Sequence, residues 1–160
     1  MNQLPQKPSA AFVGASWVAL GLGMLAYMVG LMNSEMPLVE RGYYFICLMF
    51  GLFAAVSLQK SVRDRLENVP VTAIYFGLAW VALTLAVLLT AIGLWNSSLD
   101  LASKGFYAMS YVLSLFAAVA VQKNVRDISA ADAPSGVSAW QASPERQPVL
   151  GRNSESQSDS

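Results

Sequence analysis

The sequence contains no histidine and only one cysteine, Cys47. Without histidine there is no imidazole to bind a metal or haem or to act as a general base. One cysteine can form neither an intrachain disulfide nor a cysteine-only metal site. Neither of the two common glycine-rich phosphate-binding motifs occurs either. We therefore expect no cofactor, no metal and no enzymatic activity.

Charge is also scarce, and it is balanced. The 10 basic and 10 acidic side chains make up 12% of the chain, against about 25% in soluble proteins. A neutral chain lacks the basic surface that nucleic-acid binding requires, so we expect no nucleic-acid partner. The charged residues avoid four long apolar stretches, which are residues 8–34, 42–59, 68–99 and 105–122. Uncharged runs of about 18 or more apolar residues predict transmembrane helices.

The expected fold is an all-α membrane protein with four transmembrane helices. The predicted spans are residues 10–32, 42–59, 71–95 and 105–122. Short connections after the first and third spans predict two helical hairpins, which we expect to pack as a tight bundle. The charged middle connection should extend the second helix beyond the membrane, and Pro70 should mark the restart.

These spans divide the chain into five segments. A polar N-terminal segment is followed by a first two-helix repeat, a linker, a second two-helix repeat and a tail rich in Ser that also contains Pro. Because the tail has little apolar surface to bury, we expect it to be disordered. The corresponding residues are 1–9, 10–64, 65–72, 73–127 and 128–160.

The two halves of the chain are copies of each other at a constant offset of 63 residues. Between 30–64 and 93–127, 17 of 35 positions are identical, and no gap is needed. A shared membrane composition does not explain shared Asn, Gln, Lys, Arg and Asp at fixed spacing. Each copy holds two spans, so both copies enter the membrane from the same side and form a tandem parallel repeat.

The shared residues resemble those of the YiaA/YiaB family of bacterial inner-membrane proteins, which are built from a two-helix domain. Three motifs carry the resemblance: Gly-Leu-x-Asn before each short connection, [Arg/Lys]-Gly-[Tyr/Phe]-Tyr after it, and Leu-Phe-Ala-Ala-Val followed by Gln-Lys-x-Val-Arg-Asp. The resemblance covers about residues 10–127 and is closest to the YiaA-like members. It implies an inner-membrane location, and it brings no activity, substrate or catalytic residue.

The distribution of Lys and Arg predicts the orientation. Six of these residues flank the spans on the side of the termini and the middle connection, and two lie on the side of the short connections. Because cytoplasmic loops carry the excess of positive charge, we expect both termini to be cytoplasmic.

The repeated Gln-Lys-x-Val-Arg-Asp motif is the first candidate site. It has two interpretations: a site for lipid head groups or a partner, or a basic stop signal with a local ion pair. The shared Gln and Asp keep the first interpretation open, because a stop signal does not need them. The residues are Gln59, Lys60, Arg63, Asp64, Gln122, Lys123, Arg126 and Asp127.

The residues around the short connections form a second candidate, a hairpin motif. Asn suits a left-handed helix end, Gly permits a tight approach into the next helix, and the Tyr residues suit an aromatic belt at the membrane surface. A small periplasmic recognition surface is the functional alternative. The residues are Asn33, Gly42, Tyr44, Asn96, Gly105 and Tyr107.

Small residues recur every four positions within the spans. One such row contains Cys47 and Gly51, and its copy contains Ser110 and Ser114. Such rows let helices approach closely in lipid. For the two serines we favour hydrogen bonds between helices over a polar path, and for Cys47 a packing role over a redox role, since its copy is Ser110.

Two functional hypotheses follow. The first is a non-enzymatic structural or accessory protein of membrane or envelope stress homeostasis, in contact with membrane lipids. The alternative is a small-solute or lipid transporter or channel that acts as a homo-oligomer. Since coupled transporters place ionisable residues at membrane depth and none is predicted there, the first is preferred. A continuous polar path through the bundle would favour transport, and a dry core would favour the first hypothesis.

Overall fold

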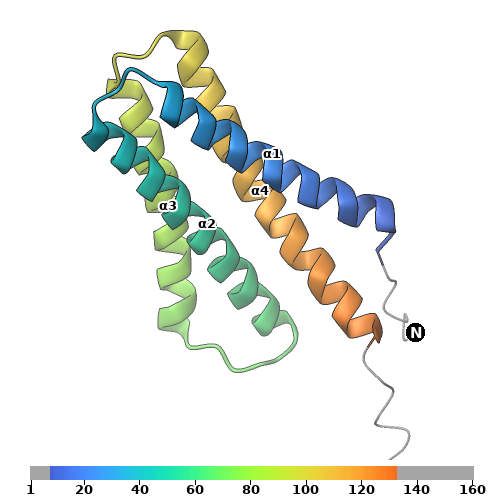
Figure 1. Cartoon of the computed structure of the whole chain (residues 1–160). Helices are drawn as coiled ribbons and strands as arrows, with labels where there is room; N and C mark the ends of the chain where they lie inside the picture. The colour runs from blue at the N-terminus through green and yellow to red at the C-terminus, as the bar shows by residue number, and fades with distance from the viewer. Residues whose placement is uncertain (1–7, 133–160) are drawn as a thin grey trace, which may run out of the picture.

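The computed structural model describes residues 8–132. It contains four helices: α1 (Ala10–Asn33), α2 (Leu38–Leu66), α3 (Ala73–Asn96) and α4 (Leu101–Asp132) (Figure 1). All four are long and apolar enough to cross a membrane. The prediction of an all-α chain with four spans is therefore confirmed.

Local capping residues set the ends of these helices. The Ser9 and Thr72 side chains accept hydrogen bonds from the N–H groups of Phe12 and Tyr75 and so begin α1 and α3. Ser9 and Thr72 are 63 residues apart, so the repeat fixes both starts. At the end of α2, Asn68 adopts a left-handed conformation with φ 57°, which stops the helix before Pro70.

The helices differ from the predicted spans at several ends. α3 begins at Ala73 rather than at residue 71, because Thr72 is the cap. α2 continues past the span to Leu66, as expected. α4 continues to Asp132, so residues 128–132 are helical rather than part of the tail. The prediction of disorder for the rest of the tail concerns residues 133–160, which lie outside the described part, as do residues 1–7.

The helices pack mainly between the repeats and not within them. α1 runs along α4 and α2 runs along α3, whereas α1 and α2 touch little, and so do α3 and α4 (Figure 1). α2 and α4 meet between these two pairs. Because α1 corresponds to α3 and α2 to α4, this pattern maps onto itself when the two repeats are exchanged. Each repeat is thus an open hairpin closed by the other.

The buried positions follow the same symmetry between the two repeats. Each buried residue of α1 has its copy buried in α3, and each buried residue of α2 has its copy buried in α4. The two repeats therefore use identical faces, as a rotation between parallel copies requires. The buried positions of the first repeat's helices are Ser16, Gly23, Tyr27, Leu31, Tyr44, Cys47, Leu48, Gly51, Ala54, Ala55, Leu58 and Ser61.

Small side chains are buried and many large apolar ones are exposed. Leu25 is 64% exposed and Phe53 is 70% exposed, whereas Ala54 and Ala86 are fully buried. In water such an exterior would be unfavourable, but in a bilayer lipid covers it and helices associate through close packing of small residues. The outer surface and the core thus both suit a membrane.

The ends of the helices lie on two sides. Figure 1 shows the start of α1, the end of α4 and the α2–α3 connection at one end of the molecule. The α1–α2 and α3–α4 connections lie at the other end, which we call the hairpin end. This separation is what four spans and a parallel repeat demand.

The close approach of α1 and α4 at Gly23 yields the first prediction. A Cβ at Gly23 would lie 2.7 Å from the Ser114 Oγ and 3.0 Å from the Ser114 backbone nitrogen. Gly23→Ala should therefore lower the free energy of unfolding by about 1–3 kcal/mol, because the two helices must move apart. The measurement is unfolding in mixed micelles, followed by circular dichroism.

Gly14→Ala in the same helix is the matched control. Nothing lies within 4 Å of a Cβ at Gly14, so this change should be neutral or stabilising by up to about 1 kcal/mol. Equal unfolding midpoints for the two variants would contradict the packing of α1 on α4.

Candidate functional site

The two Gln-Lys-x-Val-Arg-Asp motifs lie at corresponding positions near the ends of α2 and α4, away from the hairpin end. Within each motif the Arg pairs with the Asp that follows it, Arg63 with Asp64 at 3.0 Å and Arg126 with Asp127 at 3.1 Å. Lys123 also contacts Asp127, at 2.9 Å. The local ion pair that the sequence predicts is therefore present in α4.

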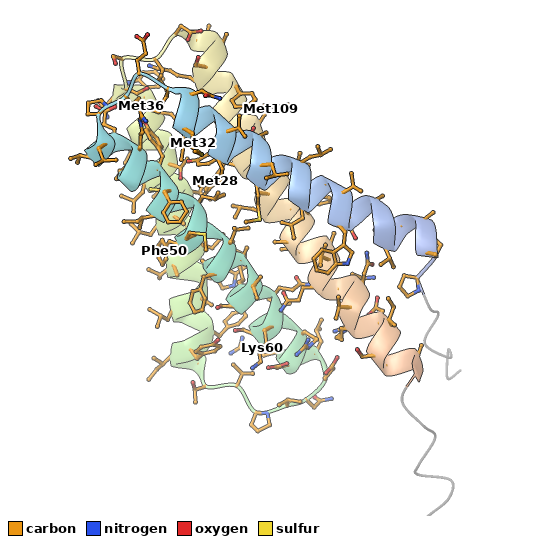
Figure 2. All side chains as sticks on the ribbon, in the orientation of Figure 1. Met28, Met32, Met36, Phe50, Lys60 and Met109 are labelled. Carbon is orange, nitrogen blue, oxygen red and sulfur yellow. The ribbon has the colours of Figure 1, made fainter. Side chains whose placement is uncertain are left out.

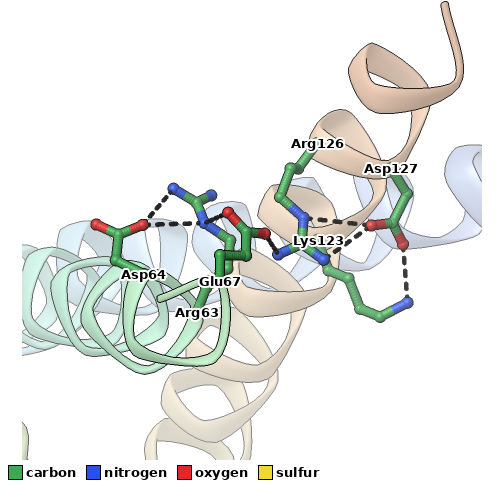
Figure 3. Close-up of polar contacts among 6 residues, drawn as sticks. All are labelled: Arg63, Asp64, Glu67, Lys123, Arg126 and Asp127. Atoms are coloured by element: carbon green, nitrogen blue, oxygen red, sulfur yellow. Dashed lines mark hydrogen bonds and ion pairs between the residues drawn. The ribbon is translucent and has the colours of Figure 1, made fainter. Parts of the chain in front are cut away.

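Glu67 joins the two motifs. Its carboxylate lies 3.2 Å from Arg126 Nη1 on α4 and 4.0 Å from Arg63 Nε on its own helix (Figure 3). Glu67 stands outside both repeated motifs. No repeat signal could have found it, because its copy is Ala130.

These contacts balance basic side chains of the two motifs with carboxylates. Arg63, Lys123 and Arg126 face three carboxylates, those of Asp64, Glu67 and Asp127, so this group of six side chains is formally neutral. Arg65, which follows the first motif, lies 4.0 Å from the centre of the Phe76 ring on α3. These six side chains form an ion-pair network between the ends of α2 and α4.

Polar atoms continue from this network into the α1–α4 seam. Asn124 is fully buried, and its Nδ2 donates to Ser16 Oγ at 2.9 Å. The Asn124 Oδ1 and the Gln122 Oε1 are buried without a partner among the described residues. Gln59, the copy of Gln122, is half-buried on α2. Both copies of the shared Gln are thus half-buried at the edge of the protein interior.

At the hairpin end, Tyr44 and Tyr107 meet between the repeats. Their rings stack with centroids 6.2 Å apart and planes inclined by 11°, and the side chains are 3% and 4% exposed. The prediction that these residues belong to an interfacial aromatic belt is wrong, because each ring packs on its copy. Their neighbours Tyr43 and Phe106 are 36% and 46% exposed.

The glycines that allow close approach are Gly30 and Gly93 of the Gly-Leu-x-Asn motif. A Cβ at Gly30 would lie 2.9 Å from the Phe106 ring, and one at Gly93 would lie 2.6 Å from the Tyr43 ring. The first motif of each repeat therefore receives the aromatic pair of the other. Gly42 and Gly105, which the sequence suggested for this role, have open space around them.

Asn33 and Asn96 do not adopt the left-handed conformation predicted for them. They are the last residues of α1 and α3, and the Ser that follows each of them has an extended backbone. The Asn96 Nδ2 donates to the Ile92 carbonyl at 2.9 Å, which holds the side chain against its own helix. Among residues 8–132 only Asn68 combines a positive φ with a side chain.

Each short connection is closed by the basic residue before the repeated Gly. Arg41 donates to the carbonyls of Met36 and Ser34, and Lys104 donates to the Trp95 carbonyl at 3.2 Å. Cations suit these helix C-terminal ends. Beside Lys104, Asp100 caps α4, and hydrogen bonds from Ser103 lower the pKa of that carboxyl.

The hydroxyls of the buried small residues bond within their own helices. Ser114 donates to the Ser110 carbonyl at 2.7 Å, and Thr90 donates to the Ala86 carbonyl at 3.0 Å. The Ser114 hydroxyl therefore donates within α4 and not, as expected, to another helix. Cys47 is buried among packing residues, as its interpretation as a small packing residue requires.

The described residues do not form a metal-binding cluster. Within residues 8–132 no three His, Cys, Asp or Glu side chains come close enough together to hold a metal ion. The carboxylates of the ion-pair network face Lys and Arg, which is an arrangement for joining helices. The arrangement can join α2 to α4 at one end, and the aromatic contacts join the repeats at the other.

Comparison with known proteins agrees with this architecture. The sequence profile described as "yiaA/B two helix domain" matches residues 12–64 and again residues 75–127. Inner membrane protein YiaA of Escherichia coli (strain K12) is 51% identical over 119 residues, which cover 74% of this chain and 82% of that protein. No solved structure matches this chain significantly.

The contact between Glu67 and Arg126 yields the second prediction. Both side chains are partly exposed, 53% and 37% respectively, so their coupling should be about 0.2–1 kcal/mol. A double-mutant cycle with Glu67→Gln and Arg126→Gln would measure it from unfolding in micelles. The coupling should fall in 1 M salt, because salt screens exposed charges.

Glu35 provides the control, because it lies in the connection at the opposite end of the molecule. A cycle of Glu35→Gln with Arg126→Gln should give no coupling. If the Glu67 cycle also gave none, the ion-pair network would not join the two helix ends.

Proposed function

This chain belongs to the yiaA/B two-helix domain family and is a four-span inner-membrane protein, and we propose that it works there as a non-enzymatic structural or accessory component of membrane or envelope homeostasis under stress. Membrane lipids are its proposed partners. The observation that carries the proposal is that each helix packs mainly on a helix of the other repeat. The two repeats therefore form one interlocked body rather than two hairpins around a path.

The core at the hairpin end supports this proposal. It is built from large side chains that fill the space between the repeats, namely Tyr27, Leu31, Met36, Tyr44, Leu48, Leu94, Tyr107 and Tyr111. Transport of a polar solute would require polar groups that face a path. The hydroxyls of Ser61, Thr90 and Ser114 instead donate to carbonyls of their own helices, which favours a packed core over the transporter alternative.

We also propose that the hairpin end faces the periplasm and that both termini are cytoplasmic. Arg41 and Lys104, the two basic residues at the hairpin end, are bound to backbone carbonyls, so their presence has a structural reason. The opposite end carries Lys60, Arg63 and Arg65 on α2 and Lys123 and Arg126 on α4. This asymmetry fits the positive-inside rule.

The third prediction tests the orientation by cysteine labelling in a Cys47→Ala background. Glu35→Cys and Ser98→Cys lie in the two short connections and are exposed. A membrane-impermeant maleimide should label both once it has access to the periplasm, while the inner membrane is intact. Val69→Cys, in the α2–α3 connection, should be labelled only after the inner membrane is permeabilised. The reverse pattern would contradict the orientation.

The fourth prediction separates the proposed role from transport. Proteoliposomes loaded with a pH-sensitive dye or with a small fluorescent solute should leak no faster than protein-free liposomes, because the core is packed.

A deletion strain should lose growth under membrane-perturbing stress and regain it with the wild-type gene, whereas Gly23→Ala should restore growth only in part. Solute or proton flux well above that of protein-free liposomes would overturn the proposal in favour of a channel or transporter.

A further inference from the structure

An apolar groove lies between α3 and α4. It has a volume of about 440 Å³, within the range of about 300–1,000 Å³ that is usual for small-molecule sites. Its walls are residues of α3 and α4, and Ala55 of α2 also lines it. α3 and α4 belong to one repeat and touch little, which is why the space between them stays open.

Several positions that line the groove hold smaller residues than their copies in the first repeat. Ala91 and Ala108 line it, and their copies in the first repeat are Met28 and Phe45. Figure 2 shows Met28 in the angle between α1 and α2, where it packs against the core. Thr90, another lining residue, replaces Tyr27. At these three positions the second repeat therefore places less side-chain volume between its two helices than the first repeat does.

The length of the groove matches one acyl chain. The lining residues extend over 83–94 on α3 and 108–119 on α4, and eleven residues of helix rise about 16 Å. This is about half of the ~30 Å hydrocarbon thickness, or one leaflet. The groove starts one helical turn below Lys104, so it runs from the hairpin end towards the middle of the membrane.

Lys104 lies one helical turn from the hairpin end of the groove. Lys104 precedes Ala108 by four residues and therefore lies on the same face of α4 as the groove. The Lys104 Nζ lies 3.2 Å from the Trp95 carbonyl at the end of α3, so the ammonium is placed between the two helices that form the walls. An ammonium has three donors, and this carbonyl takes one. Arg41, the copy of Lys104, is bound to two carbonyls of its own connection.

We propose that this groove binds one phospholipid of the leaflet at the hairpin end, with an acyl chain between α3 and α4 and the phosphate at Lys104. The lining is apolar along its length, which suits a hydrocarbon chain. The Lys104 ammonium is opposite in charge to a phosphate, and the nearby Asp100 carboxylate is bound to backbone N–H groups at the start of α4. The site is independent of which side of the membrane the hairpin end faces.

The test uses the purified full-length chain in mild detergent with added palmitoyl-oleoyl phosphatidylglycerol, followed by native mass spectrometry. Wild type should retain one lipid per chain. The double variant Ala91→Met with Ala108→Phe fills the groove with the residues that the first repeat has at these positions. It should weaken retention at least about tenfold, equivalent to about 1.4 kcal/mol. Lys104→Gln should weaken it about fivefold, which corresponds to about 1 kcal/mol.

Ala15→Met with Ala11→Phe is the matched control, because both alanines are exposed on α1 and lie outside the groove. This variant should retain the lipid as wild type does. Equal retention in the groove-filled variant would overturn the proposal. A groove-filled variant that keeps its lipid but loses a dimer seen in wild type would also overturn it and would assign the groove to a second copy.

A cross-linking experiment on an otherwise wild-type chain keeps the proposal testable if the filled variant does not fold. Val112→p-benzoylphenylalanine places a photoreactive group in the groove, and Met49→p-benzoylphenylalanine places one at the corresponding position of the first repeat. After purification in detergent, irradiation should give a phospholipid adduct at residue 112 and little at residue 49. Equal lipid adducts at both positions, or a cross-linked second chain at 112, would contradict the proposal.

Discussion

The contact between α1 and α4, with its copy between α3 and α2, is the interaction on which the rest of the structure depends. In a bilayer the apolar surfaces of helices are already solvated by lipid, so helices associate only where their backbones come close. Gly23 against Ser114 is such a place, and Ala86 and Gly51 are buried at the corresponding positions. Because these faces match between repeats and not within them, the two hairpins open and interlock.

The aromatic contacts at the hairpin end follow from that exchange. Once α1 lies on α4, Gly30 faces the Phe106–Tyr107 pair, and the copy of this contact brings Gly93 to Tyr43 and Tyr44. The Tyr44 and Tyr107 rings then stack on each other at the contact between the two repeats. At the other end, Arg126 reaches Glu67 only because α2 and α4 meet in the middle of the molecule. Both ends of the molecule are therefore held by contacts between the repeats.

Departures from the repeat symmetry are as informative as the symmetry itself. Glu67 has Ala130 as its copy, and Asn124 has Ser61, so the ion pair to Arg126 and the buried amide occur on one side only. The groove between α3 and α4 is likewise lined by Ala91 and Ala108, whose copies in the first repeat are the larger Met28 and Phe45. A duplicated chain can keep one half for packing while the other half gains a surface of its own.

The sequence alone determined the four spans, the parallel repeat and the start of α1, because each depends on local information. Charge-free length defines a span, a fixed offset of 63 residues defines a repeat, and Ser9 and Thr72 cap helices through hydrogen bonds three residues away. Only the tertiary structure decided which helices pack. The short connections made α1 and α2 look like natural neighbours, but the small buried faces fit across the repeats.

The candidate residues divide in the same way. Gly30 and Gly93 stood in a motif that the sequence displayed, yet their role required knowing that the other repeat's aromatic rings lie against them. Tyr44 and Tyr107 had the spacing of an interfacial belt, and the exchange of helices turned them inward. Sequence periodicity reports which face of a helix is apolar or small, but in lipid both kinds of face can be buried or exposed. The partner of each face is set by shape, and shape exists only in the folded molecule.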